Sequence, residues 1–417
     1  MWKSALTGMT VAMMLGIAPA AADTTVRMLH VESNPETQDL WNQAAADFEA
    51  ANPGVDVDIQ YLENEAFKAK LPTLLQSDDR PNIIYSWGGG VMRAQNDAGF
   101  LADVTEEASA FTDVFSPGAA QAFNIDGKIV GAPNHLSEVV FFYNKDLIDQ
   151  AGVDVDAIVT WDDFLAAVQQ VKDAGITPIV VGGGEKWPMH FYWSYLVMRI
   201  GGGDALAQAT AEGSEGFNSD TFIQAGEKLQ ELAALEPFQD GWLATMFPQS
   251  AGQWGDGEGA FQLMGSWLTN TQRNNAADGV GVPDDKIGIL SFPVIDGGKG
   301  TRTETLGGIN GWLITDGSPP EAIAFVRHFL QPDYQRIAAE KGFYIPANVG
   351  IDDAITDPLQ KRMAEDLSAS TYHQIFFDQD LGPSVGRVVN DISVAIAAGD
   401  MTPEEGAEAV QEAWEQR

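Results

Sequence analysis

The first part of the chain changes its hydrophobic periodicity from segment to segment. Residues 26–31 are mainly apolar and predict a buried strand, and residues 55–59 alternate apolar and polar side chains, which predicts a second strand. Between these strands, one helical face carries Thr37, Leu40, Trp41, Ala44, Ala45 and Phe48. The Asn52-Pro53-Gly54 segment ends that helix. A strand, a helix and a strand in this order indicate a parallel sheet covered by helices.

Later segments predict helices that begin after side chains able to accept hydrogen bonds from the first N–H groups of a helix. Such starts follow Thr160, Ser318 and Thr402, each of which precedes apolar residues at helical spacing. The acidic C-terminal segment is therefore predicted to be an amphipathic helix that packs on the protein. Residues 82–85 predict a further short strand, which leads into Trp87. Together these patterns predict an α/β fold.

The N-terminal residues have the pattern of a secretory signal peptide. Lys3 precedes an apolar run over residues 5–17, which is too short to span a bilayer. Ala20 and Ala22 form the small-residue pattern at which such peptides are cleaved. We therefore predict a signal peptide over residues 1–22 and a periplasmic protein with no stable membrane insertion. Because the chain has no cysteine, we expect no lipid anchor.

Charge and length restrict the partners and the number of domains. The formal net charge is -37, which repels nucleic acid and anionic lipid headgroups. We interpret the acidity as a solvated surface suited to a salty environment, and attraction of a cationic substrate is the alternative. About 395 residues remain after the predicted cleavage, more than one hydrophobic core normally organises. Two domains with a ligand cleft between them are expected.

The sequence contains no signature of a common catalytic or metal centre. The five histidines lack H-E-x-x-H or other close metal-ligand spacing, and residues 182–186 lack the GK[ST] ending of a phosphate-binding loop. Cysteine and a G-x-S-x-G motif are also absent. We therefore expect no metal, no cofactor and no enzymatic activity. The many carboxylates leave a periplasmic glycoside hydrolase as an alternative.

Aromatic residues beside flexible segments indicate a carbohydrate ligand. Indole faces pack against the CH groups of a sugar ring, while carboxylates and amides bind its hydroxyl groups. Aromatic residues in or beside glycine- and proline-containing segments are Trp87, Trp187, Trp193, Trp267, Trp312 and Tyr344.

A series of motifs resembles the family-1 extracellular solute-binding proteins of ABC sugar importers, the group that includes maltose-binding proteins. In chain order, the segments that carry the resemblance are 48–55 (FEAANPGV), 127–133 (GKIVGAP), 141–147 (FFYNKDL), 160–164 (TWDDF), 257–267 (GEGAFQLMGSW) and 307–312 (GGINGW). Each motif is weak alone, whereas their shared order and spacing are specific. The resemblance covers almost the whole mature chain, which departs from the family pattern in its extreme acidity.

The resemblance implies a two-lobed periplasmic-binding-protein fold, with discontinuous lobes joined by crossing strands and a central ligand cleft. We predict lobe one over residues 23–137 plus 286–331 and lobe two over residues 138–285 plus 332–417. The implied function is to capture a mono- or small oligosaccharide, as a monomer, and to deliver it to the transmembrane permease subunits of an ABC transporter. A compatible solute in the same fold is the alternative ligand.

Mapping the family motifs onto the chain implies a set of ligand-binding residues. Trp267 is expected to stack on the sugar, and Asp378 is expected to bind its hydroxyl groups. The full set, with Ser33 as a neighbouring candidate, is Glu32, Asn34, Trp87, Asn134, His135, Trp187, His190, Trp193, Trp267, Gly308, Asn310, Tyr344 and Asp378.

Overall fold

Parallel strands and their connecting helices form the beginning of the described chain. The computed structural model describes residues 24–109 and 112–417, so the predicted signal peptide lies outside the described residues. Strand β1 (Thr24–His30) pairs in parallel with β2 (Val55–Tyr61) and with β3 (Ile83–Ser86). The helix between the first two strands, α1 (Pro35–Ala51), buries the six residues that the sequence places on its inner face. The predicted strand-helix-strand opening is confirmed.

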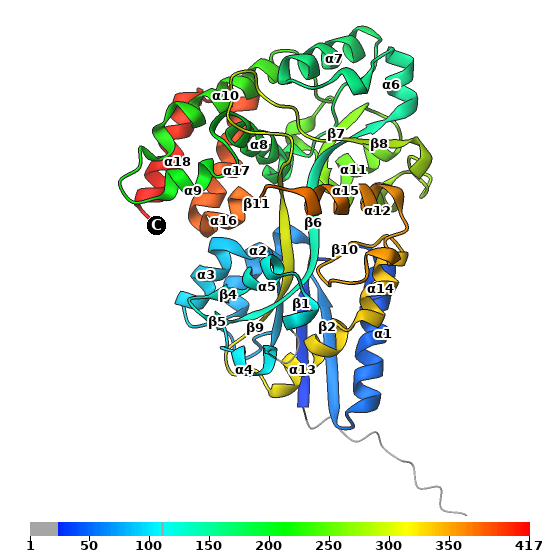
Figure 1. Ribbon diagram of the computed structural model, residues 1–417, viewed down its shortest axis with the longest axis vertical. Coiled ribbons are helices and arrows are strands. Elements are labelled where there is room, and N and C mark those ends of the chain that lie inside the picture. The colour runs from blue at the N-terminus through cyan, green and yellow to red at the C-terminus, as the bar shows by residue number, and fades with distance from the viewer. Residues whose placement is uncertain (1–23, 110–111) are drawn as a thin grey trace, which may run out of the picture.

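Two long strands connect the two halves of the molecule. Strand β6 (Gly131–Asn144) and strand β9 (Glu304–Ile314) pair antiparallel with each other. At one end β9 pairs with β3, and at the other it pairs with β11 (Tyr372–Ile375). Strand β6 likewise pairs first with β10 (Ile345–Pro346) and then with β7 (Phe261–Gly265) and β8 (Ile287–Leu290). Figure 1 shows both strands running between the lobes, which confirms the predicted two-lobed α/β fold.

Each lobe has its own hydrophobic core. The first core draws its buried residues from segments 26–132 and 312–347, and the second draws them from segments 139–306 and 339–410. The predicted border after residue 331 assigns Phe343 and Tyr344 to lobe two, whereas both side chains pack in the first core. The lobe borders stay a prediction, and this packing favours a border nearer residue 350.

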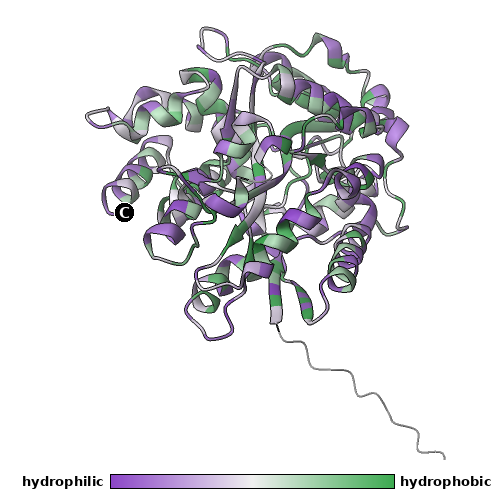
Figure 2. Cartoon of the chain, turned by 60° about the horizontal axis from the view of Figure 1, so that its bottom comes forward, coloured by the Kyte–Doolittle hydropathy of each residue, from purple (hydrophilic) through white to green (hydrophobic). Residues whose placement is uncertain are grey.

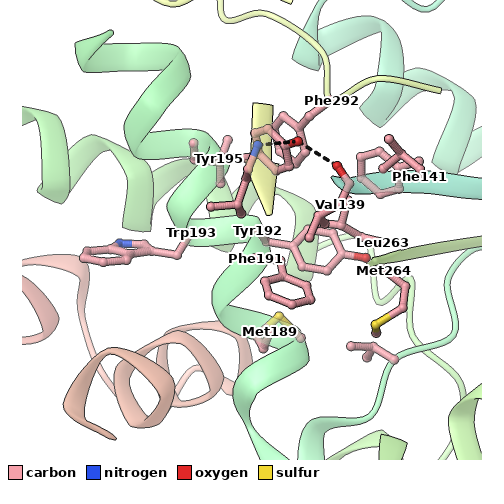
Figure 3. Close-up of a cluster of buried hydrophobic side chains, with 14 of the residues drawn as sticks. Val139, Phe141, Met189, Phe191, Tyr192, Trp193, Tyr195, Leu263, Met264 and Phe292 are labelled. Carbon is pink, nitrogen blue, oxygen red and sulfur yellow. Dashed lines mark hydrogen bonds between the residues drawn. The ribbon is translucent and has the colours of Figure 1, made fainter. Parts of the chain in front are cut away.

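Helix α8 (Trp187–Gly201) is tied to both crossing strands. The Tyr195 hydroxyl donates to the Val139 carbonyl of β6 at 2.6 Å and accepts from the Leu306 N–H of β9 at 3.1 Å (Figure 3). These two hydrogen bonds fix the position of α8 relative to the strands. The first turn of α8 therefore has a defined place beside the region where the lobes meet.

Helix starts follow the predictions at two of three positions. Thr160 and Asp163 form a capping box at α7 (Trp161–Asp173), and Thr402 forms one at α18 (Pro403–Glu415). The prediction for Ser318 is wrong, because the residue that precedes α13 (Pro320–Phe329) is Pro319 and no side chain caps this helix. The proline at the first position of α13 has no N–H group, so one fewer donor at this helix start needs a hydrogen-bond acceptor.

The other helices pack around the strands of both lobes and carry hydrophilic as well as hydrophobic residues (Figure 2). They are α2 (Asn64–Leu74), α3 (Gly89–Asp97), α4 (Thr105–Ala108), α5 (Pro117–Gln121), α6 (Lys145–Ala151), α9 (Ala205–Thr210), α10 (Asp220–Ala233), α11 (Phe247–Gly255), α12 (Leu268–Asn275), α14 (Pro332–Glu340), α15 (Pro358–Ala369), α16 (Phe377–Asp380) and α17 (Gly382–Ala398). A hairpin of β4 (Asn124–Ile125) and β5 (Lys128–Ile129) completes this set. Across residues 24–109 and 112–417, no helix combines the length and apolar character needed to span a membrane.

Candidate functional site

A cavity of about 1000 Å³, counted with the solvent space at its mouth, lies between the two lobes. Its first-lobe wall follows the ends of the parallel strands, where side chains from successive loops meet at one edge of a sheet. Its second-lobe wall comes from the starts of α8, α11 and α16 and from the segment after β7. The lining residues are Val31, Glu32, Ser33, Tyr61, Glu63, Asn64, Lys68, Tyr85, Trp87, His135, Trp187, His190, Phe191, Phe247, Pro248, Trp267, Thr271, Asn310, Phe376, Asp378 and Gln379.

Most of the residues predicted from the sequence line this one cavity. They come from both lobes and from the two crossing strands, although they are spread over more than three hundred positions of the chain. The predicted residues that line the cavity are Glu32, Ser33, Trp87, His135, Trp187, His190, Trp267, Asn310 and Asp378. Their role in ligand binding stays a prediction.

Three predicted residues support the cavity from behind rather than lining it. Asn34 caps α1, because its Oδ1 accepts from the Glu36 N–H at 3.0 Å. Asn134 is fully buried, with its Nδ2 3.0 Å from His135 Nδ1. The Tyr344 ring stacks on the His135 ring, with 4.8 Å between the ring centroids. These contacts hold the loop after β1 and the His135 side chain in place.

Two further predicted residues belong to the packed interior. Trp193 has no exposed surface and lies against the rings of Phe222 and Phe377. The Gly308 N–H donates to Ser137 Oγ at 2.9 Å on the neighbouring crossing strand. Neither residue lines the cavity, because α8 turns Trp193 away from it and β9 is closely packed at Gly308.

Several lining residues were missed from the sequence. Tyr61 and Tyr85 lie at the carboxyl ends of β2 and β3, and Glu63 follows β2, so the rule for parallel strand ends was a usable signal. Phe247 follows Met246, and Phe376 lies between Ile375 and Phe377, so both residues belong to local apolar groups. The local pattern does not distinguish these two residues from core residues.

Aromatic rings from the second lobe form one continuous wall of the cavity. The Trp267 ring centroid lies 6.3 Å from that of Trp187, 6.5 Å from that of Phe191 and 6.1 Å from that of Phe376. The indole lies over Gly265, where any side chain would occupy its space. On the first lobe, the Trp87 ring contacts Tyr85 at a centroid distance of 5.2 Å. The cavity therefore offers flat apolar surfaces from both lobes.

The first-lobe carboxylates are partly committed to the protein's own N–H groups. Both Glu63 oxygens accept from the backbone at the start of α2, at 3.0 to 3.1 Å. Glu32 Oε1 accepts from the Asn34 N–H at 2.7 Å. Burial raises the pKa of Glu32, and hydrogen bonds from the backbone of Asn34 and Ser33 oppose this rise.

Asp378 is the buried carboxylate of the second-lobe wall. Its Oδ2 accepts from Gln379 Nε2 at 3.1 Å and from Asn390 Nδ2 at 3.3 Å. Lys68 of the first lobe places its Nζ 3.9 Å from the same oxygen, so this contact joins the two lobes. Within the described part of the chain, Oδ1 receives no hydrogen bond, so it is an acceptor available to a ligand.

His190 faces that free oxygen. Its Nδ1 lies 2.7 Å from the Trp187 carbonyl, which can only accept, so Nδ1 carries a proton. Its Nε2 lies 3.8 Å from Asp378 Oδ1 and has no hydrogen-bond partner among the described residues. Burial lowers the pKa of His190, although the Asp378 charge raises it. A neutral His190 therefore presents a bare nitrogen to the carboxylate.

His135 anchors the polar side of the cavity at the crossing strands. Its ring nitrogens lie 3.0 Å from Asn134 Nδ2 and 2.9 Å from Asn310 Nδ2. Burial lowers the pKa of His135 to about 3, so the ring is neutral at physiological pH. These contacts orient the Asn310 side chain, which is 2% exposed and lines the cavity.

Comparison with known protein families assigns the chain. Residues 34–336 match the model of a bacterial extracellular solute-binding protein. The chain belongs to this family. The resemblance stated from the sequence motifs is thus confirmed, and the matched segment includes α1, both crossing strands and most of the cavity lining.

Two relatives of this solute-binding protein match part of its length. An ABC transporter extracellular-binding protein of Pyrococcus horikoshii is 25% identical over 259 residues, which cover 61% of this chain and 58% of the relative. An arabinooligosaccharide-binding protein of Halalkalibacterium halodurans is 26% identical over 227 residues, which cover 54% and 48%. The chain thus matches about half the length of each relative. Both relatives are named as binding proteins and not as enzymes.

A solved structure shares the fold over nearly the whole chain. A chitin oligosaccharide binding protein superposes with a TM-score of 0.85 at 23% identity, covering 94% of this chain and 98% of that protein. At this level of identity the similarity establishes the fold alone. It supports the two-lobed arrangement on which the cavity depends.

Proposed function

We propose that the protein binds a mono- or small oligosaccharide in the cavity between its lobes and delivers it to the permease of an ABC importer. The observation that carries this proposal is the composition of the cavity. Trp87 and Trp267 supply flat apolar faces from opposite lobes, while Asp378 supplies a carboxylate oxygen that receives no hydrogen bond within the described chain. Sugar rings need both kinds of surface at once.

Family membership supports the transport setting of this proposal. Solute-binding proteins of this kind are extracellular, and the relative from Pyrococcus horikoshii is named as part of an ABC transporter. We place the mature chain in the periplasm as a monomer, after removal of residues 1–22. Its partners in this proposal are the sugar and the transmembrane permease subunits.

Binding without catalysis agrees with the way the cavity carboxylates are used. Both Glu63 oxygens are held by backbone N–H groups of α2, which leaves this residue poorly placed to transfer protons. Asp378 accepts hydrogen bonds from two side-chain amides and lies 3.9 Å from the Lys68 ammonium group. A glycosidase needs two carboxyl groups that flank the scissile bond, one to donate a proton to the leaving group and one to act as a base or nucleophile.

A quaternary ammonium solute is less well matched to the cavity than a sugar. Cation binding in an aromatic cage requires open ring faces. The Lys68 Nζ lies 5.5 Å from the centre of the Trp87 ring, so the protein's own ammonium group is already present in this part of the cavity. A second cation beside it would be repelled.

A ligand screen tests the proposed function directly. The mature protein is heated with arabinose, galactose, arabinotriose, chitobiose, raffinose and glycine betaine in turn, and sugars that raise Tm are titrated by calorimetry. A ligand present at about 100 times its Kd adds roughly 2.7 kcal/mol to the stability, a readily measured shift. Chromatography of the same mixtures detects products. Stabilisation by glycine betaine alone, or turnover of a sugar, would overturn the proposal.

A further inference from the structure

The two lobes meet at the start of α3. This helix begins in the run Gly88-Gly89-Gly90 of the first lobe, and it lies against α16 and α17 of the second lobe (Figure 1). Gly90 follows the cavity residue Trp87 by three positions, and its contact Asp380 follows the cavity residue Asp378 by two. The contact therefore sets how far apart the two cavity walls lie.

The approach at this contact is backbone to backbone. A methyl group built on Gly90 would lie 2.7 Å from the Gly382 nitrogen and closer still to the Asp380 carbonyl oxygen. A methyl group on Gly89 would lie 2.9 Å from the Asp380 Cα. Atoms of the main chain cannot move aside as a flexible side chain does, so a side chain at either position requires the lobes to separate.

We propose that Gly90 is a positioning residue for ligand capture, because its missing side chain permits the closed contact between α3 and the α16–α17 turn. A larger residue holds the lobes apart and keeps Trp87 from reaching a sugar bound on the second-lobe wall. The inference rests on the proposed function, since closure matters only if a ligand is held between the lobes.

A substitution at Gly90 tests the contact between the lobes without adding backbone strain. Gly88 and Gly89 have φ values of 74° and 67°, where any side chain is strained regardless of space. Gly90 lies inside the helix without a positive φ, so alanine suits its local conformation and favours the helix. Gly118, an exposed helical glycine of the same lobe with open space around its Cβ position, is the matched control.

The test compares G90A with G118A and the wild type. Each protein is titrated with the sugar from the screen that stabilises the wild type most, and the radius of gyration is measured by X-ray scattering with and without that sugar. We expect G90A to bind about ten- to a hundredfold more weakly, because overpacking a close contact opposes closure. At saturating sugar it should stay more expanded than the wild type. Its sugar-free Tm should match or exceed that of G118A.

Two results would overturn the proposal for Gly90 and leave the proposed function standing. One is equal sugar affinity and equal compaction in G90A and the wild type. The other is a sugar-free Tm well below that of G118A, which would show that the contact stabilises the empty fold. If the wild type and G118A bind no sugar of the panel, the proposed function fails first, and the closure role of Gly90 falls with it.

Discussion

Replacing Asp378 with asparagine changes one atom of the cavity in a predictable way. Asp378 Oδ2 accepts from the Gln379 and Asn390 amides, so the asparagine oxygen will take that place. The new NH2 group then takes the place of Oδ1, 3.8 Å from His190 Nε2, which is a bare acceptor. D378N thus offers the histidine a donor and removes the acceptor that faces the cavity.

The two consequences have different sizes. Loss of a charged acceptor for a sugar hydroxyl costs about 1.5–3 kcal/mol, or roughly 10- to 150-fold in Kd. A hydrogen bond between the new NH2 group and His190, which requires the two groups to approach from 3.8 Å, adds about 0.5–1.5 kcal/mol to the stability of the empty protein. Loss of the Lys68 contact, at 3.9 Å and with Lys68 28% exposed, subtracts at most about 1 kcal/mol. The sugar-free Tm should therefore move little.

Calorimetry with the sugar chosen by the screen measures the change in affinity. Thermal unfolding without sugar measures the change in the stability of the empty protein. D378A serves as the contrast, because alanine leaves the Gln379 and Asn390 amides without this partner and should lower both affinity and Tm. Unchanged affinity in D378N would refute the ligand role of Oδ1. A fall in Tm as large as that of D378A would refute the assignment of the His190 proton.

Other substitutions test separate parts of the structure. W267A should weaken sugar binding by about 1–3 kcal/mol in calorimetry and leave the sugar-free Tm close to the wild-type value, whereas a large loss of Tm would identify Trp267 as a core residue. Burial raises the pKa of Glu185 from 4.5 to about 7, so the folded state binds this proton more tightly and the wild type loses stability as pH rises from 4.5 to 7. E185Q lacks this loss, so its free energy of unfolding in urea should rise by about 1–3 kcal/mol relative to that of the wild type between pH 5 and pH 8. A difference in unfolding free energy that stays constant over this range would contradict the raised pKa of Glu185. T160A removes the capping box of α7 and should cost about 0.5–2 kcal/mol of unfolding free energy without changing sugar affinity.

Local patterns were sufficient wherever a segment decides its own structure. The inner face of α1 was predicted residue by residue, because a helix with a single apolar stripe has one way to bury it. The helix starts after Thr160 and Thr402 were predicted because the donors and acceptors of a cap lie within one turn. The prediction for Ser318 failed because α13 begins at Pro320, directly after Pro319, and no side chain caps this helix.

The division of aromatic residues between core and cavity required the tertiary structure. Helix α8 is buried along nearly its whole length, so its sequence has no polar face to orient it. Trp187 and Trp193 are six residues apart, which places them about 120° apart around the helix axis. One therefore lines the cavity while the other packs in the core.

The sequence by itself determined the opening strand-helix-strand order, the helix starts after Thr160 and Thr402, and the family, because these depend on neighbouring residues or on motifs kept in order. Only the tertiary structure decided which polar groups meet. Lys68 and Asp378 are more than three hundred residues apart, and they come within 3.9 Å because β6 and β9 carry the chain between two separate cores. No local periodicity encodes such a contact, since it depends on how the two lobes are oriented around the crossing strands.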